Sequence, residues 1–138
     1  MLPNENLELI RHSFPLIFQH KAEITTKFYE GLFRDAPELR RLFSKEMNVQ
    51  KDMLVSVLTT LAKASFDEGL VESMIARMAR VHSGLGITSG QFRTGEAALL
   101  SALDQSVGDL LSETTLDAWK TAVRRVISAM IDPPTVEA

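Results

Sequence analysis

Apolar residues recur every three or four positions along most of the chain, and this spacing restricts the fold more than any other feature. It places apolar side chains along one face of an α-helix. No stretch of alternating apolar and polar residues is long enough to compete as a β-strand. The pattern therefore predicts an all-α fold of six to eight helices, with connectors short enough to keep successive helices adjacent.

Prolines and capping residues mark where the expected helices begin and end. Pro15 lies inside the first apolar repeat, so we expect a kink or an early end there, because proline lacks the N–H that a helix interior uses. Thr88 and Gln91 have the spacing of a capping box, and Ser112 is a second expected N-cap. The helices are expected from about residue 4, over 21–35 and 49–65, from 71 to the glycines at 84–86, over 88–110, and from 113 to the prolines at 133–134, with a short helical piece at 37–43.

The composition fits one domain, 1–138, with a helical core over about 5–131 and a short tail at 132–138. Apolar residues make up 45% and charged residues 24%, a balance typical of globular proteins. The net charge of −3 gives no general attraction to nucleic acid or to an anionic membrane. Cysteine is absent, which excludes disulfides, thiolate metal sites and cysteine nucleophiles. No apolar run approaches the ~20 residues of a membrane helix and the N-terminus lacks a signal-peptide pattern, so we expect a cytoplasmic protein.

His82 raises the question of function, since it stands in the last turn of an expected helix, just before Gly84 and Gly86. Alone, a histidine there is most simply a partly exposed residue that interacts with the helix dipole. A zinc site is not expected, because no second ligand stands at metal-binding spacing around it, and His12 and His20 lie far away in the sequence. A haem differs, because the porphyrin supplies four nitrogens and the protein needs to add only one axial ligand.

Further residues fit a haem pocket, although each has a simpler explanation by itself. Gln50 is a polar residue at the start of an otherwise apolar face, which a solvated helix start would also explain. Tyr29, the only tyrosine, is by itself a core-edge residue, and Phe43 is by itself a core aromatic. Leu54 follows Gln50 by one turn and projects from the same side. Their combination with His82 favours a ligand pocket.

Together these residues resemble a globin, and most of all the haem domain of bacterial flavohaemoglobins and the single-domain bacterial haemoglobins. The likeness is carried by FYEGLFRDAPELRRLF at 28–43, QKDMLVSVLTTLA at 50–62, VHSGLGI at 81–87 and LDAWKTA at 116–122. Each motif alone is weak, but their order and spacing together are specific and extend over about residues 5–131. The resemblance implies a globin fold around a pocket for haem b.

The resemblance also implies a role for each residue of the pocket. His82 would be the iron ligand, and its second ring nitrogen would donate to the backbone carbonyl of Met78 one turn earlier. Phe43 would pack on the porphyrin, while Tyr29 and Gln50 would line the distal side and Leu54 would limit the space there. The other expected wall residues are apolar and more certainly core residues than haem contacts: Met53, Val57, Met78, Ile87, Phe92 and Leu99.

Two distal donors would favour the binding of oxygen. A tyrosine hydroxyl and an amide N–H each contribute on the order of 1–2 kcal/mol to holding an oxygen molecule that carries partial negative charge. Two such donors predict high affinity and slow release. Because Gln50 stands in place of a distal histidine, we expect pentacoordinate iron that reversibly binds oxygen, nitric oxide and carbon monoxide.

The chain departs from the family pattern at two places. Phe92 and Pro134 stand where flavohaemoglobins resemble one another in a tyrosine and a glutamate that bond to the iron-ligating histidine. A histidine without a carboxylate partner is a weaker electron donor, which disfavours peroxidase-like activation and favours ligand carriage. The sequence also has no G-x-G-x-x-G fingerprint and no room for a reductase domain, so any turnover is expected to need an external reductase.

Three functions stay open from the sequence. A haem globin would store or deliver oxygen, or would remove nitric oxide as a dioxygenase that uses the external reductase. A gas sensor would act through a partner protein, because the sequence contains no output domain. A haem-free interaction module of globin fold is disfavoured by the presence of His82, Phe43, Tyr29 and Gln50. A monomer or a weak homodimer is expected.

Overall fold

Seven helical segments make up the part of the chain that the structure, a computed structural model, describes: residues 4–43, 47–63 and 68–132. They are α1 (Asn4–Gln19), α2 (Lys21–Asp35), the 3-10 helix η1 (Pro37–Leu42), α3 (Met47–Lys63), α4 (Glu68–Ser83), α5 (Ser89–Val107) and α6 (Glu113–Ile131). These residues contain no strand, and none of their helices is long and apolar enough to cross a membrane. The all-α prediction is confirmed. The helix ends expected near residue 65 and at 133–134 lie outside the described residues.

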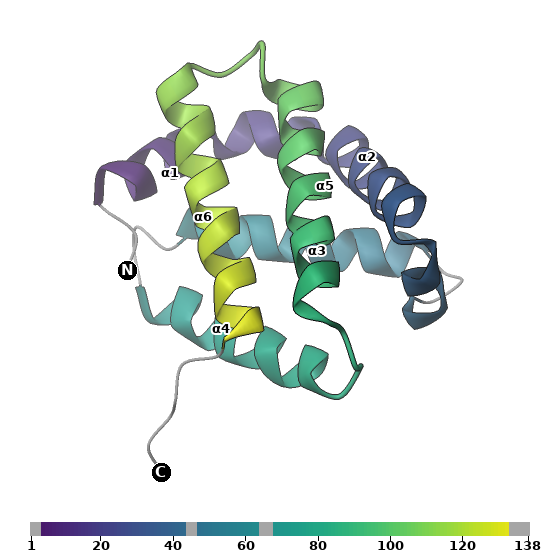
Figure 1. Cartoon of the computed structure of the whole chain (residues 1–138). Helices are drawn as coiled ribbons and strands as arrows, with labels where there is room; N and C mark the ends of the chain where they lie inside the picture. Colours follow the sequence, from purple (N-terminus) through teal and green to yellow (C-terminus); the bar gives the residue numbers. More distant parts are fainter. Residues whose placement is uncertain (1–3, 44–46, 64–67, 133–138) are drawn as a thin grey trace.

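The helices form two crossing layers, with α4 along one edge. In Figure 1, α5 and α6 run side by side in front, and α1 and α3 cross behind them. α2 packs on α5, and α4 packs on α6 and α3. Within the described residues, α5 is not closely packed on either α3 or α4. α5 therefore makes its close helix contacts with α2 and α6.

The core is centred on Trp119 of α6, whose side chain is fully buried together with Ile10 and Ile17 of α1. A buried indole N–H needs an acceptor, and here it donates to the Ser13 hydroxyl oxygen at 2.7 Å. The Ser13 hydroxyl donates in turn to the backbone carbonyl of Leu9 at 2.7 Å. This relay of two hydrogen bonds joins α1 to α6.

Capping residues set the starts of α5 and α6 as predicted. Thr88 and Gln91 form a capping box, in which the Gln91 N–H donates to the Thr88 hydroxyl at 3.1 Å and the Thr88 N–H donates to the Gln91 side chain at 3.0 Å. The Ser112 hydroxyl accepts the backbone N–H of Thr115 at 3.1 Å. Between α4 and α5, Gly86 has a φ of 71°, which lies in the left-handed region that favours glycine. Local sequence therefore fixes the turn that follows α4.

Two expected helix boundaries are wrong. α1 does not end early but continues through Pro15. Pro15 is exposed, whereas Ile17 close by is buried, so packing of the apolar face holds the helix together where proline removes a hydrogen bond. α5 ends at Val107 and not at 110, because a glycine follows as C-cap, and Leu110 is 54% exposed in the turn beyond it.

Candidate functional site

α4 directs His82 toward the interior of the protein. Its inner face carries the buried residues Met74, Ile75 and Ala79, and helical spacing puts His82 on the same face. The imidazole is half-buried, and its Nδ1 lies 2.7 Å from the backbone carbonyl oxygen of Met78. The hydrogen bond to Met78 that the resemblance implied is therefore present.

This contact decides which ring nitrogen of His82 is available as a ligand. A carbonyl oxygen can only accept, so Nδ1 carries the proton and Nε2 of the neutral ring keeps its lone pair. Within residues 4–43, 47–63 and 68–132, no three His, Asp or Glu side chains lie close enough to hold a metal ion. One nitrogen ligand suits a group that supplies its own remaining ligands, as haem does, and does not suit a bare ion.

The side chains near His82 are apolar and only partly covered by protein. The ring of Phe92 on α5 lies with its centroid 5.9 Å from the centroid of the His82 ring. Leu54 and Val57 of α3 and Met78 of α4 are half-buried against the main core. Because α5 is not closely packed on α3 or α4 in the described residues, neighbouring helices leave these side chains partly uncovered. A partly covered apolar surface beside a single nitrogen ligand fits a haem.

The remaining expected wall residues differ in burial. Ile87 is half-buried, and Leu99 is buried in the main core. Met53 is 56% exposed, so the expectation that it belongs to the core is wrong. It stands at the edge of the apolar face of α3, about 140° around the helix from the buried Leu58. The buried side of α3 therefore does not extend to Met53.

Tyr29 of α2 and Gln50 of α3 are joined in a way that the sequence did not predict. The Tyr29 hydroxyl donates to the backbone carbonyl of Gln50 at 3.0 Å. The Tyr29 side chain is 7% exposed, and burial raises the pKa of its hydroxyl to about 12. A phenol has one hydrogen, so in this arrangement that hydrogen is committed to the Gln50 carbonyl. The side-chain amide of the half-buried Gln50 is a separate donor.

Phe43 belongs to an aromatic cluster around Tyr29. Its ring centroid lies 5.6 Å from that of Tyr29 and 5.3 Å from that of Phe33, both in edge-on geometry. Phe33 stacks on Tyr29 at 5.9 Å, and Phe28 meets Tyr29 edge-on at 4.7 Å. Phe28 and Phe33 were not predicted as site residues, although both stand in the FYEGLF segment. Three rings therefore hold the Tyr29 ring, which fixes the direction of its hydroxyl.

A second hydrogen bond ties α3 to α2. Lys51 Nζ donates to the Thr26 hydroxyl at 3.1 Å. Thr26 stands about one turn before Tyr29, and Lys51 follows Gln50 directly, so the two contacts are neighbours on both helices. A lysine and a threonine in separate helices have no sequence signature, and neither residue was predicted as part of the site. Together the two hydrogen bonds fix the first turns of α3 against α2.

The expected site residues thus fall into two groups. Tyr29 and Phe43 belong to a small cluster of α2, η1 and α5, whereas Met78 and Phe92 pack against the main core. Within the described part of the chain, no hydrogen bond or ring contact joins His82 to Tyr29. A bound group that reaches both clusters would make them one site.

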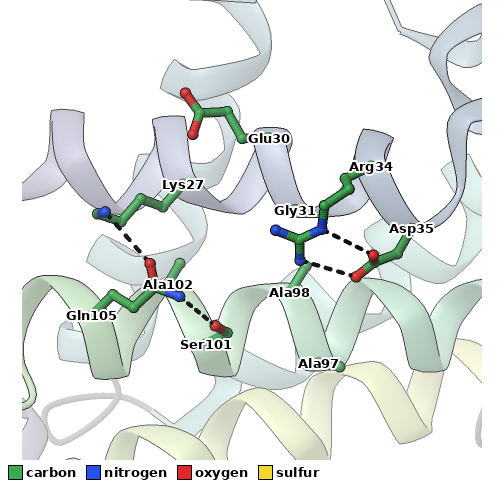
Figure 2. A pocket seen from close by; sticks show the side chains of 10 residues that line it. All are labelled: Lys27, Glu30, Gly31, Arg34, Asp35, Ala97, Ala98, Ser101, Ala102 and Gln105. Carbon is green, nitrogen blue, oxygen red and sulfur yellow. Dashed lines mark hydrogen bonds and ion pairs between the residues drawn. The ribbon is translucent and has the colours of Figure 1, made fainter.

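A hollow of about 270 Å³ lies elsewhere, between α2 and α5 (Figure 2). Several of its polar side chains pair with one another: Lys27 donates to Gln105 at 3.4 Å, and the Gln105 amide donates to a serine hydroxyl at 2.8 Å. Small residues such as Gly31 and Ala98 line its floor and let the two helices approach closely. None of the expected site residues lines this hollow. It is explained by helix packing.

The globin family model matches residues 26–130, a range that includes all the site residues described above. The flavohemoprotein of Bacillus subtilis is 27% identical over 134 residues, which cover 95% of this chain and 34% of that protein, so the chain spans about a third of the length of this relative. A bacterial globin structure from Campylobacter jejuni has a TM-score of 0.77 at 25% identity, with 94% of each chain covered. An engineered carbene transferase, made from a Rhodothermus marinus protein proposed to be a nitric oxide dioxygenase, has a TM-score of 0.78 at 27% identity and covers 94% of this chain and 91% of its own. A family match over most of the chain, with the same fold in these relatives, establishes that the chain belongs to the globin family.

Proposed function

We propose that the chain binds haem b through Nε2 of His82 and reversibly binds oxygen and other diatomic gases at that haem. The observation that carries the proposal is the hydrogen bond from His82 to the Met78 carbonyl, because it leaves Nε2 as the ligating nitrogen. The flavohemoprotein relative supports haem as the group bound. Haem iron supplies the coordination position for the gas.

The side chains around His82 would orient and shield the group. The Met78 carbonyl fixes the tautomer and the rotation of the imidazole. Phe92, Leu54 and Val57 supply apolar surface that excludes water. The partner of His82 is a neutral carbonyl and not a carboxylate, so the ring donates less electron density. This favours reversible gas binding over peroxidase-like chemistry.

Gln50 and Tyr29 are the two polar donors proposed for the gas side. The Tyr29 hydrogen already goes to the Gln50 carbonyl, so donation to a gas would replace that bond and not add to it. A hydrogen bond to an acceptor with negative charge contributes about 1.5–3 kcal/mol and one to a neutral carbonyl about 0.5–1.5 kcal/mol, so the exchange gains about 1 kcal/mol. The Gln50 amide breaks no bond to Tyr29 when it donates. We therefore propose high oxygen affinity in which Gln50 contributes at least as much as Tyr29.

Removal of nitric oxide is the second candidate function. The fold similarity to the Rhodothermus marinus protein favours it. The chain would then act with a separate reductase that restores ferrous iron after each turnover. Sustained consumption of nitric oxide in the presence of oxygen and a reductase would support this reading, and consumption that stops after one equivalent would contradict it.

A haem titration tests the main proposal, and the chain provides a matched control. His20 also has its Nδ1 near the carbonyl of the residue one turn earlier, Leu16, at 2.9 Å. Addition of haem to the wild type and to His20→Ala should produce a Soret band, whereas His82→Ala should give no stable complex. Circular dichroism shows whether each variant keeps its helices. A Soret band of full intensity in folded His82→Ala would contradict the proposed ligand.

A further inference from the structure

Two hydrogen bonds attach residues 50–54 of α3 to α2, and they differ in chemistry. The Tyr29 hydroxyl donates to the Gln50 backbone carbonyl at 3.0 Å, and Lys51 Nζ donates to the Thr26 hydroxyl at 3.1 Å. Among the side chains that the structure describes in α2 and α3, these are the hydrogen bonds that join the two helices. The Lys51 ammonium has three hydrogens to donate, whereas the Tyr29 hydroxyl has one. The Tyr29 bond is therefore lost whenever its donor turns to another acceptor.

The Tyr29 oxygen stays in place while its hydrogen is free to turn. Three phenylalanine rings hold the Tyr29 ring, so rotation about the C–O bond changes the acceptor but not the position of the oxygen. Burial raises the pKa of the hydroxyl to about 12, so the hydrogen is present at neutral pH. The hydroxyl can therefore donate to the Gln50 carbonyl or to an acceptor in the pocket, but not to both.

The Gln50 carbonyl belongs both to the helix and to its attachment. In an α-helix it accepts the backbone N–H four residues further on, which is that of Leu54. A carbonyl oxygen has two lone pairs, so it accepts this N–H and the Tyr29 hydroxyl together. When the hydroxyl turns away, the bond within the helix remains and the bond to α2 is lost. Residues 50–54 then keep their helical form but are attached to α2 by the Lys51 bond alone.

We propose that oxygen releases residues 50–54 of α3 from Tyr29 when it binds, and that carbon monoxide does not. This rests on the proposed function, because both gases would bind at the haem held by His82. Bound oxygen carries partial negative charge, and a hydrogen bond to a charged acceptor is stronger than one to a neutral carbonyl, so the Tyr29 hydrogen moves to the oxygen. Carbon monoxide is a weak acceptor, so with this gas the hydrogen stays on the Gln50 carbonyl. A change that depends on which gas is bound is what a gas sensor needs.

The release is a local loosening of α3 and not a displacement of the helix. α3 also packs on α1 and on α4, and the Lys51 bond remains in both gas complexes. Loss of one hydrogen bond to a neutral carbonyl makes local opening of this segment about two- to tenfold more frequent. The exchange of backbone amide hydrogens with solvent measures such opening.

Amide hydrogen exchange of the ferrous, haem-loaded chain tests the proposal by comparing the oxygen complex with the carbon monoxide complex. Exchange is followed by mass spectrometry in peptides that cover residues 50–58 of α3. Peptides of α6 are the internal reference, because neither of the two bonds involves α6. In the oxygen complex residues 50–58 should exchange about two- to tenfold faster than in the carbon monoxide complex, while α6 exchanges equally in both.

Two variants separate the movement of the Tyr29 hydrogen from a purely structural attachment. In Tyr29→Phe the bond is absent with either gas, so residues 50–58 should exchange at the same, raised rate in both complexes. Thr26→Val removes the Lys51 bond, so exchange should rise in both complexes while the ratio between them stays as in the wild type. Circular dichroism shows whether each variant keeps its helices.

Three results would overturn the proposal. They are equal exchange of residues 50–58 in the two wild-type complexes, a ratio between the gases that persists in Tyr29→Phe, and a ratio that disappears in Thr26→Val. A sample that gives no Soret band, or that binds neither gas in its ferrous form, contradicts the proposed function itself. That failure is seen before any exchange is measured, so the two failures are distinguishable.

Discussion

Replacement of Tyr29 by phenylalanine removes one hydroxyl and keeps the ring that packs among Phe28, Phe33 and Phe43. The hydrogen bond to the Gln50 carbonyl is lost, and such a bond contributes about 1 kcal/mol net to stability. Gln50 is half-buried, so water can reach its carbonyl in the variant and limits the penalty. We expect the free energy of unfolding of the haem-free protein to fall by about 0.5–1 kcal/mol. With a slope of about 2 kcal/mol/M, the urea midpoint falls by about 0.3–0.5 M.

The same change tests the gas side of the site. If the Tyr29 hydroxyl moves from the carbonyl to a bound gas, it gains about 1 kcal/mol, which corresponds to about fivefold in the rate of release. Stopped-flow measurement on the haem-loaded variant should therefore show oxygen leaving about fivefold faster than from the wild type.

Thr26→Val is the control for both measurements. It removes the neighbouring hydrogen bond between α2 and α3 and keeps the shape of the side chain. It should lower stability by a similar amount and leave oxygen release unchanged. Equal release rates for wild type and Tyr29→Phe would refute a donor role for the hydroxyl. Equal acceleration in Tyr29→Phe and Thr26→Val would show that helix attachment, and not donation, sets the rate.

Three further predictions concern the polar contacts. Ser13→Ala leaves the buried indole N–H of Trp119 without its acceptor and should lower the free energy of unfolding by about 1–3 kcal/mol. Ser56 is an exposed serine that also donates to the carbonyl four residues earlier, so Ser56→Ala should change the free energy of unfolding little. Urea unfolding followed by tryptophan fluorescence measures both variants, and equal effects would contradict the relay. Gln50→Leu keeps the backbone carbonyl that accepts the Tyr29 hydroxyl, so the free energy of unfolding should stay the same while oxygen release accelerates by about fivefold or more. An unchanged release rate in stopped flow would show that the Gln50 amide does not donate to the bound gas. Burial raises the pKa of Tyr29 from 10 to about 12, so its contribution to the free energy of unfolding is complete below pH 10 and is lost as the pH rises through 12. The free energy of unfolding should therefore fall over this pH range in the wild type and fall less in Tyr29→Phe. Parallel curves of stability against pH for the two proteins would contradict the raised pKa.

Local patterns in the sequence predicted the helices, and the resemblance to globins implied the contact between His82 and Met78. Apolar periodicity gave the all-α class, and the spacing of Thr88 and Gln91 gave a capping box that the structure contains. The hydrogen bond between His82 and Met78 was predictable because it spans one helical turn, so helix geometry alone brings the two groups together. Features that depend on one helix can be read from its sequence.

Features that depend on how two helices pack could not be read in the same way. The partner of the Tyr29 hydroxyl is a backbone carbonyl, which every residue has, so no residue type in the sequence identifies it. Pro15 was expected to kink α1 or to end it early; the early end is wrong, because the buried face around Ile17 outweighs the local loss. Met53 was expected to be a core residue, but its side chain is 56% exposed, because the partners of α3 cover other sides of this helix. In each case the tertiary neighbours decided the outcome.

The relay from Trp119 through Ser13 to Leu9 has a consequence for how the protein is made. The two side chains that it joins lie 106 residues apart, in the first and the last helix. During synthesis α1 leaves the ribosome before α6, so the tryptophan that donates to the Ser13 hydroxyl emerges only with α6. Until then the buried face of α1 has no permanent cover, so its native packing is completed only after α6 has emerged. A nascent chain stalled before α6 should therefore be open to proteases and chaperones, and the docking of α6 would complete the packing of α1.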